Sequence, residues 1–256
     1  MVLAAGGWPG GWTVLWVTAA MVGARTCAMA TNRVVDRWID ARNPRTAGRH
    51  LPRGTLRVGA LRLLAAGGAA LMLVAAALLN PLCLALAPPA LLFLVGYSYT
   101  KRFTWASHWI LGFTDGIAAA GGWIAVRGAF EPPAFVLWLA LTVWIAGFDI
   151  LYACQDIEID RAQGLYSVPA RFGVGRALAL ARVNHALTAA ALAGLGVLMA
   201  LGVFYWLGWL VVVGLLIYEH SLVRPHDLSR LDMAFFNVNG YIAVIVLVAV
   251  VGGLWR

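Results

Sequence analysis

The stretch Asn32–Asp40 reads NRVVDRWID and closes an apolar run that begins near residue 10. On an α-helix its four-residue spacing stacks Asn32, Asp36 and Asp40 on one face, one above the other. Two carboxylates in that position repel each other, so an isolated helix gains nothing from the pair unless a cation lies between them. The stretch therefore predicts one half of a site for a metal ion and a diphosphate.

The composition of the whole chain places these acids in a membrane protein. The 256 residues are 62% hydrophobic and 12% charged, with a mean hydropathy of +0.82, which excludes an ordinary soluble globular domain. A formal charge of +8 could suggest a nucleic-acid partner, but apolar runs of about 20 residues, long enough to cross a bilayer, recur along the chain. We therefore expect the lipid bilayer, and no nucleic acid, as a partner. The spacing predicts an all-α transmembrane bundle with spans over 10–32, 58–79, 82–100, 106–126, 133–154, 177–200, 203–219 and 235–255.

The basic residues predict the topology of these spans. Alternate crossings place segments 33–57, 101–105, 155–176 and 220–234 on one side, and these segments hold most of the arginines. Of the opposite connections, only the one near Arg127 carries a basic residue. By the positive-inside rule, the arginine-rich side is expected to be cytoplasmic.

A second acidic stretch, Asp149–Asp160, reads DILYACQDIEID and ends the fifth predicted span. Separations of seven and four residues predict that its aspartates share one helix face with Tyr152. Both acidic stretches end spans on the same side, so both can face one cavity that opens to the cytoplasm. Carboxylates at a membrane edge are costly, and oxygen ligands suit Mg²⁺, so we predict a magnesium site built from Asp36, Asp40, Asp156 and Asp160. The alternative is that these acids only neutralise neighbouring arginines.

The two stretches together resemble the UbiA-type membrane prenyltransferases. That family carries an Asn-x-x-x-Asp-x-x-x-Asp motif, matched at 32, 36 and 40, and an Asp-x-x-Tyr-Ala-x-x-Asp-x-x-x-Asp motif, matched at 149, 152, 153, 156 and 160. The flanking segments 43–46, 51–54, 97–102 and 167–173 also look like the family, and the resemblance runs from about residue 10 to about residue 245. Its nearest branch is that of the bacterial 4-hydroxybenzoate polyprenyltransferases and similar enzymes of a menaquinone pathway.

The resemblance implies a single domain over residues 1–256 in the bacterial plasma (inner) membrane, with helices around a central cavity. The family has nine transmembrane helices and eight are predicted here, so we expect the family's first helix to be absent from this sequence. The implied reaction joins a polyprenyl group from a polyprenyl diphosphate to an aromatic acid acceptor, 4-hydroxybenzoate or a hydroxynaphthoate, for ubiquinone or menaquinone biosynthesis. Mg²⁺ is the implied cofactor.

The resemblance also assigns roles to single residues. Asp36, Asp40, Asp156 and Asp160 would hold Mg²⁺, Asn32 would add a neutral contact, and Asp149 and Tyr152 complete the catalytic set. Lys101 and Arg102 follow Tyr97 in a family-like motif and are the favoured binders of the diphosphate, because such cations match phosphate oxygens. Further candidates are Arg45, Arg49, Arg53 and Arg171, for which plain positive-inside charge is the alternative. The rings of Tyr97, Phe148 and Tyr152 would stabilise an allylic cation.

Three polar positions stand apart from the motifs. Arg25 lies seven residues before Asn32, two turns deeper on the same face, where a buried arginine needs an anion. That anion is either a protein acid such as Asp149 or, by the resemblance, the carboxylate of the aromatic acceptor. Asp115 in the fourth span either pairs with an arginine or lines the cavity. His220 is expected in a loop or a helix cap.

Two other functions remain open from the sequence. Acids inside membrane spans can mark the ion pathway of a transporter. Against that function, the acids gather at one face beside cations suited to a diphosphate. An inactive truncated homologue is the remaining alternative.

Overall fold

The computed structural model describes residues 1–254, and of Phe235 it describes only the backbone. Within this part of the chain the regular structure is helical, apart from one isolated bridge between Arg224 and Asp227. Eight helices are long and apolar enough to cross a membrane, and the chain is an all-α integral membrane protein. The elements are α1 (Val2–Ala5), α2 (Gly11–Arg42), α3 (Val58–Leu79), α4 (Pro81–Thr100), α5 (Ser107–Arg127), α6 (Pro132–Ala153), η1 (Cys154–Asp156), α7 (Ile157–Ala162), α8 (Val168–Phe172), α9 (Val174–Leu198), α10 (Val203–Leu222), η2 (Met233–Val238) and α11 (Asn239–Gly253).

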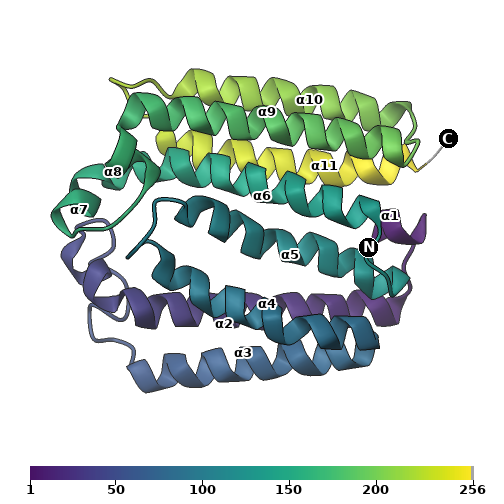
Figure 1. Cartoon of the computed structure of the whole chain (residues 1–256), viewed down its shortest axis with the longest axis horizontal. Helices are drawn as coiled ribbons and strands as arrows, with labels where there is room; N and C mark the ends of the chain where they lie inside the picture. The colour runs from purple at the N-terminus through teal and green to yellow at the C-terminus, as the bar shows by residue number, and fades with distance from the viewer. Residues whose placement is uncertain (255–256) are drawn as a thin grey trace.

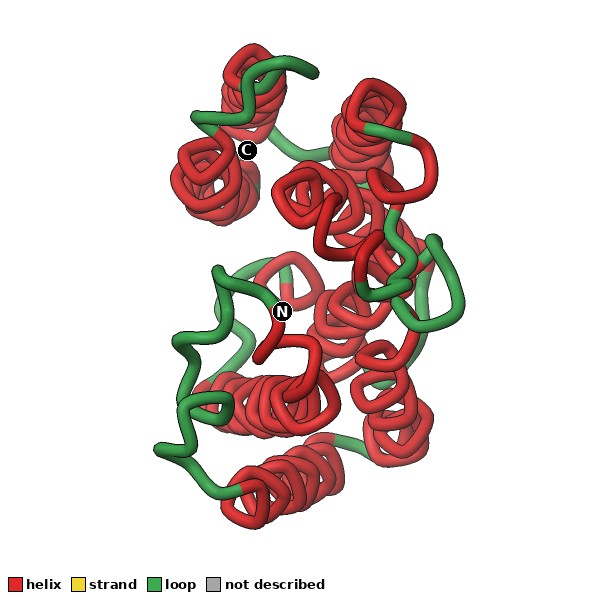
Figure 2. Tube along the Cα trace, turned by 90° about the vertical axis from the view of Figure 1, so that its left-hand side faces the viewer, coloured by secondary structure: helices red, strands yellow, loops and turns green. Residues whose placement is uncertain are grey.

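The long helices lie side by side with their axes roughly parallel (Figure 1). The close neighbours are α2 with α3 and α4, α4 with α5, α5 with α6, α6 with α9, and α10 with α9 and α11. Seen along the helices, this order forms a curved row, with α2, α3 and α4 at one end and α10 and α11 at the other (Figure 2). The short helices α7 and α8 and the α2–α3 loop gather at one end of the bundle. The predicted central cavity stays a prediction.

The predicted spans agree with the observed helices except at α2. That helix continues to Arg42, ten residues beyond the predicted end at residue 32. The whole Asn32–Asp40 stretch is therefore helical. The last predicted span, 235–255, is the π-helix η2 followed by α11, and Trp255 lies outside the described residues.

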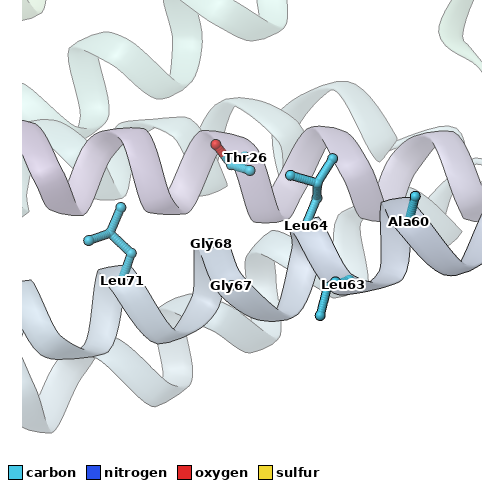
Figure 3. A pocket seen from close by; sticks show the side chains of 7 residues that line it. All are labelled: Thr26, Ala60, Leu63, Leu64, Gly67, Gly68 and Leu71. Carbon is cyan, nitrogen blue, oxygen red and sulfur yellow. The ribbon is translucent and has the colours of Figure 1, made fainter.

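Close helix contacts depend on glycines at two facing positions. A side chain on Gly23 of α2 would meet the backbone oxygen of Gly68 of α3 at 2.6 Å, and a side chain on Gly68 would meet that of Gly23 at the same distance. The neighbouring Gly67 has nothing within 4 Å. It belongs instead to an apolar groove of about 450 Å³ between the two helices, lined by Thr26, Ala60, Leu63, Leu64, Gly67, Gly68 and Leu71 (Figure 3).

A buried polar cluster joins α6, α9, α10 and α11. Asn239 donates from Nδ2 to Glu219 Oε1 at 3.1 Å and accepts at Oδ1 from Trp144 Nε1 at 2.9 Å. His185 Nδ1 lies 3.0 Å from His220 Nε2, and both Glu219 and His185 are at most 2% exposed. The prediction for His220 was therefore wrong, because it lies inside α10 and bonds to the neighbouring helix α9. The environment of His220 depends on how the helices pack together, and the spacing of residues along one helix does not reveal that packing.

Candidate functional site

Asp36 lies at the centre of the first acidic stretch and is 2% exposed. Its Oδ2 lies 2.5 Å from Lys101 Nζ and accepts from Asn32 Nδ2 at 3.0 Å. Its Oδ1 accepts from Arg102 Nη2 at 3.0 Å, and Arg102 also donates to the backbone oxygens of Val35 and Ser98. The end of α4 is therefore fastened to α2 through one buried carboxylate with two cations.

Asp40 lies one turn further and is 5% exposed. Its Oδ1 accepts from Arg49 Nη1 at 2.7 Å, and Arg33 Nη1 lies 3.9 Å from its Oδ2. Within the described chain Oδ2 is buried and accepts no hydrogen bond, although Thr46 Oγ1 donates to the backbone oxygen of Asp40. A buried carboxylate oxygen without a donor is available to a further cation.

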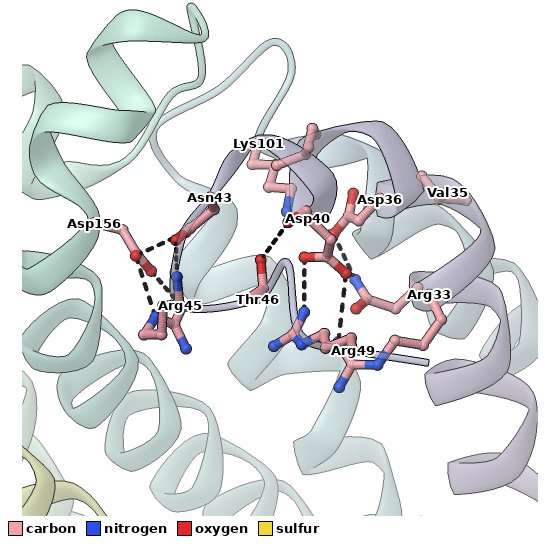
Figure 4. A network of polar contacts seen from close by, with 12 residues as sticks. Arg33, Val35, Asp36, Asp40, Asn43, Arg45, Thr46, Arg49, Lys101 and Asp156 are labelled. Atoms are coloured by element: carbon pink, nitrogen blue, oxygen red, sulfur yellow. Dashed lines mark hydrogen bonds and ion pairs between the residues drawn. The ribbon is translucent and has the colours of Figure 1, made fainter. Parts of the chain in front are cut away.

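The α2–α3 loop connects the two acidic stretches (Figure 4). Arg45 Nη2 lies 2.5 Å from Asp156 Oδ2, and Asn43 Nδ2 donates to Asp156 Oδ1 at 3.0 Å. Asn43 in turn accepts the backbone N–H of Arg45 at Oδ1. Burial lowers the pKa of Arg45, but its hydrogen bonds to Asp156 outweigh burial and raise that pKa, so the guanidinium stays charged. Arg45 also donates to Tyr152 Oη at 3.0 Å, with its Cζ 5.0 Å from the centre of that ring.

The second acidic stretch is helical throughout but passes through one 3₁₀ turn, and the shared helix face stays a prediction. The helix α6 ends at Ala153, a 3₁₀ turn follows over Cys154–Asp156, and α7 begins at Ile157. The acids of this stretch have different partners. Asp149 pairs with His108, Asp156 with Arg45, and Asp160 accepts from Ser167 Oγ at 2.7 Å.

His108 is the site residue that sequence reasoning missed. It is 3% exposed, and its Nδ1 lies 2.7 Å from Asp149 Oδ2. No motif marks it, since its only sequence signal is a lone histidine at the start of the fourth span. Its partner lies 41 residues away on the neighbouring helix.

Tyr97 faces the interior between several acids. It is half-buried on α4, within electrostatic range of Asp36, Asp115 and Asp149. Those acids belong to α2, α5 and α6, so the four helices turn polar side chains toward one region. The structure thus brings together most of the predicted site residues.

Three predicted binding residues lie outside this network. Arg53 and Arg171 are exposed, and their side chains make no hydrogen bond or ion pair with any described residue. Arg25 was expected to be buried but is exposed, and it too has no ion pair within residues 1–254. Arg25 is within electrostatic range of Asp115 but forms no ion pair with it, so both interpretations of Asp115 stay open.

The acids are arranged around cations rather than around a preformed metal cage. Among the described residues no three acidic, histidine or cysteine side chains converge as a metal site. The donors nevertheless fit a hard divalent ion, because they are carboxylates and Asp40 Oδ2 is buried without a hydrogen bond.

The model of the UbiA prenyltransferase family matches residues 1–253. The chain belongs to the UbiA prenyltransferase family. Two relatives are 4-hydroxybenzoate octaprenyltransferases. The one from Xanthomonas campestris pv. campestris (strain B100) is 34% identical over 212 residues, which cover 76% of this chain and 69% of the relative. The one from Aromatoleum aromaticum is 30% identical over 249 residues, which cover 97% of this chain and 84% of the relative.

Solved structures of UbiA homologs have the same fold. The apo homolog from Aeropyrum pernix K1 superposes with a TM-score of 0.89 at 30% identity, covering 98% of this chain and 92% of that one. A homolog from Archaeoglobus fulgidus bound to GPP and Mg²⁺ superposes with a TM-score of 0.70 at 20% identity, covering 97% and 92%. At 20% identity, the likeness to the Archaeoglobus fulgidus homolog shows a shared fold alone.

Proposed function

We propose that this UbiA-family protein transfers a polyprenyl group from an allylic polyprenyl diphosphate to an aromatic acid, 4-hydroxybenzoate or a hydroxynaphthoate. The observation that carries the proposal is the bridge from Arg45 to Asp156, which holds the two acidic stretches at the same end of the bundle. The 4-hydroxybenzoate octaprenyltransferase relatives support the acceptor class. The basic loops support a site that faces the cytoplasm of a bacterial plasma membrane, with the product used in ubiquinone or menaquinone biosynthesis.

In this reaction the bond between the allylic carbon and the diphosphate oxygen breaks, and the allylic carbon bonds to the aromatic ring, which loses a proton. Four cations beside the acids would bind the diphosphate through their N–H donors. They are Arg45, Arg49, Lys101 and Arg102. Each of these cations could bind a phosphate oxygen in place of its carboxylate partner while staying at the same end of the bundle. This exchange frees the acids for a metal.

Asp36, Asp40, Asp156 and Asp160 would hold Mg²⁺, with Asn32 as a neutral neighbour. When bound, Mg²⁺ neutralises the negative charge that develops on the leaving diphosphate. The ring of Tyr152 lies against the Arg45 guanidinium, so the site already accommodates a cation on an aromatic face. An allylic cation beside Tyr152, Tyr97 and Phe148 would be stabilised by the same interaction.

The acceptor would bind deeper between α2 and α5. Arg25 is without an ion pair in the described chain and would orient the carboxylate of the aromatic acid. Asp149 lies on the adjacent side, and its Oδ1 accepts no hydrogen bond from a described residue. That oxygen is available to the hydroxyl group of the acceptor ring.

The test is a prenyl-transfer assay with purified protein in detergent. We expect Mg²⁺-dependent release of diphosphate from a prenyl diphosphate, with a prenylated aromatic acid identified by mass spectrometry. The acceptors offered are 4-hydroxybenzoate and dihydroxynaphthoates, each with several donor chain lengths. Asp36→Ala and Asp156→Ala should abolish the product.

The matched control is Glu158→Ala. Glu158 lies between Asp156 and Asp160 in the sequence but is exposed and makes no ion pair with a described residue. It should keep wild-type activity. Full activity in both aspartate variants would defeat the proposal, and a wild-type protein without turnover would favour an inactive homologue.

A further inference from the structure

His108 connects α5 to two other elements through both ring nitrogens. Nδ1 lies 2.7 Å from Asp149 Oδ2 of α6, and Nε2 lies 3.1 Å from the backbone nitrogen of Val168 at the start of α8. The imidazole is 3% exposed and Val168 is fully buried. The contact with Val168 is therefore shielded from competing water, whereas the Asp149 side chain is 29% exposed.

The contact with Val168 decides where the proton of the ring lies. A backbone N–H can only donate, so Nε2 must offer its lone pair. In the neutral ring the proton is then on Nδ1, which donates to the Asp149 carboxylate. A second proton on the ring would break the bond to Val168. The surroundings thus fix the neutral Nδ1–H tautomer.

The segment Tyr166–Val168 also holds a second acid of the site, Asp160. Ser167 Oγ donates to Asp160 Oδ2 at 2.7 Å and accepts the N–H of Ala170 as the N-cap of α8. Tyr166 N donates to the backbone oxygen of Lys101 at 2.7 Å. One short segment therefore fixes Asp160, the end of α4 and, through His108, Asp149.

We propose that His108 is a positioning residue that holds Asp149 toward the aromatic acceptor. This inference rests on the proposed function. The N–H donor at Oδ2 keeps the carboxylate oriented, and leaves Oδ1 for the hydroxyl group of the acceptor. The link to Val168 couples that orientation to the Ser167–Asp160 contact, so Asp149 and Asp160 keep a constant relative position. His108 itself touches neither the Arg45 bridge nor Asp36, so it reaches the donor site only indirectly, through Ser167 and Asp160.

The kinetic test compares His108→Leu with His108→Gln. Leucine removes both contacts, and we expect kcat/KM for the acceptor to fall roughly 100-fold, a typical effect of a misplaced catalytic group. The KM for the prenyl diphosphate should change much less, because His108 reaches the donor site only through Ser167 and Asp160. Glutamine offers an N–H donor and an oxygen acceptor at the end of its side chain, so it should recover most of the lost acceptor kcat/KM. Equal losses in His108→Gln and His108→Leu, or equal effects on both substrates, would overturn the proposal.

A second measurement tests the contact without any turnover. In protein labelled with ¹⁵N at its five histidines, the resonances lost in His108→Gln identify His108. We expect them to show a protonated Nδ1 and an unprotonated Nε2, and to shift in Asp149→Ala. An Nε2–H tautomer would overturn the inference. If the expected tautomer is seen in a protein that does not transfer prenyl groups, the proposed function fails while the contact stands.

Discussion

Arg45 and Asp156 are 111 residues apart in the sequence, yet Arg45 Nη2 lies 2.5 Å from Asp156 Oδ2. This ion pair makes the α2–α3 loop the connection between the two acidic stretches. Because Arg45 also donates to Tyr152 and its backbone N–H donates to Asn43, the loop is held from both sides. A diphosphate that replaced Asp156 as the partner of Arg45 would lie between the two acidic stretches.

Replacing Arg45 therefore tests the bridge as a donor site. Arg45→Ala should raise the KM for the prenyl diphosphate by roughly 10-fold or more, because a hydrogen bond to a charged group contributes about 1.5–3 kcal/mol. Steady-state kinetics with varied donor gives the value. Arg53→Ala is the matched control, since Arg53 belongs to the same loop but is exposed and has no described partner. Equal effects of the two substitutions on this KM would mean that donor binding depends only on the net charge of the loop.

Asp40 Oδ2 gives a prediction about the metal. Asp40→Asn should raise the Mg²⁺ concentration for half-maximal activity by roughly 10-fold, because it removes a carboxylate oxygen that is buried without a hydrogen bond and whose charge suits Mg²⁺. The measurement is a titration of chelator-treated protein with Mg²⁺. Asparagine keeps an oxygen acceptor for Arg49, so the substitution removes the charge of Asp40 while leaving a hydrogen-bond partner in place. An unchanged Mg²⁺ requirement would exclude Asp40 as a ligand.

The sequence was sufficient for the fold class and the helices, because a span of about 20 apolar residues has one stable form in a bilayer. It was also sufficient to predict that both acidic stretches lie at one end of the bundle. It did not reveal the 3₁₀ turn after Ala153, because a 3₁₀ turn and an α-helical turn differ little in local residue preference. It also did not reveal that Asp149, Asp156 and Asp160 have three different partners, because those partners come from other parts of the chain.

The contacts that sequence reasoning missed all join residues far apart in the chain. His108 and Asp149 are 41 residues apart, and His185 and His220 are 35 residues apart. Which helix faces pack together decides such pairs, and the hydrophobic pattern of a membrane helix leaves this choice open because both lipid and protein neighbours are apolar. Arg25 illustrates the same limit, since depth in the span suggested burial whereas the structure leaves it exposed.

The glycines of α3 predict a contrast between two neighbouring positions. Gly68→Val should lower the free energy of unfolding by about 1–3 kcal/mol, because its side chain would meet the backbone of α2. Gly67→Val should leave stability near that of the wild type, because that position opens onto the groove of Figure 3. Thermal unfolding in detergent compares the two. A similar loss in both variants would indicate an effect on α3 itself rather than on its contact with α2.

Asn239 allows a test of the buried polar cluster. Asn239→Leu removes the partner of both Trp144 Nε1 and Glu219 Oε1, and an unsatisfied buried group costs about 1–3 kcal/mol. We expect a corresponding fall in the midpoint of thermal unfolding. Asn237→Leu, two residues earlier at an exposed position, is the control and should unfold like the wild type. Wild-type stability of Asn239→Leu would mean that the cluster contributes nothing to holding α6, α10 and α11 together.

Replacing Arg25 tests whether this residue binds only one of the two substrates of the proposed reaction. Arg25 is exposed within its span and forms no ion pair with a described residue, so a substrate carboxylate is the anion it would bind. Arg25→Ala should raise the KM for the aromatic acid by roughly 10-fold or more while the KM for the prenyl diphosphate stays within about twofold, since a charge-assisted hydrogen bond contributes about 1.5–3 kcal/mol. Arg62→Ala, which removes an exposed arginine from α3, controls for the loss of positive charge. If Arg25→Ala changed both KM values equally, Arg25 would act on the shape of the site through Asp115 and not on the acceptor.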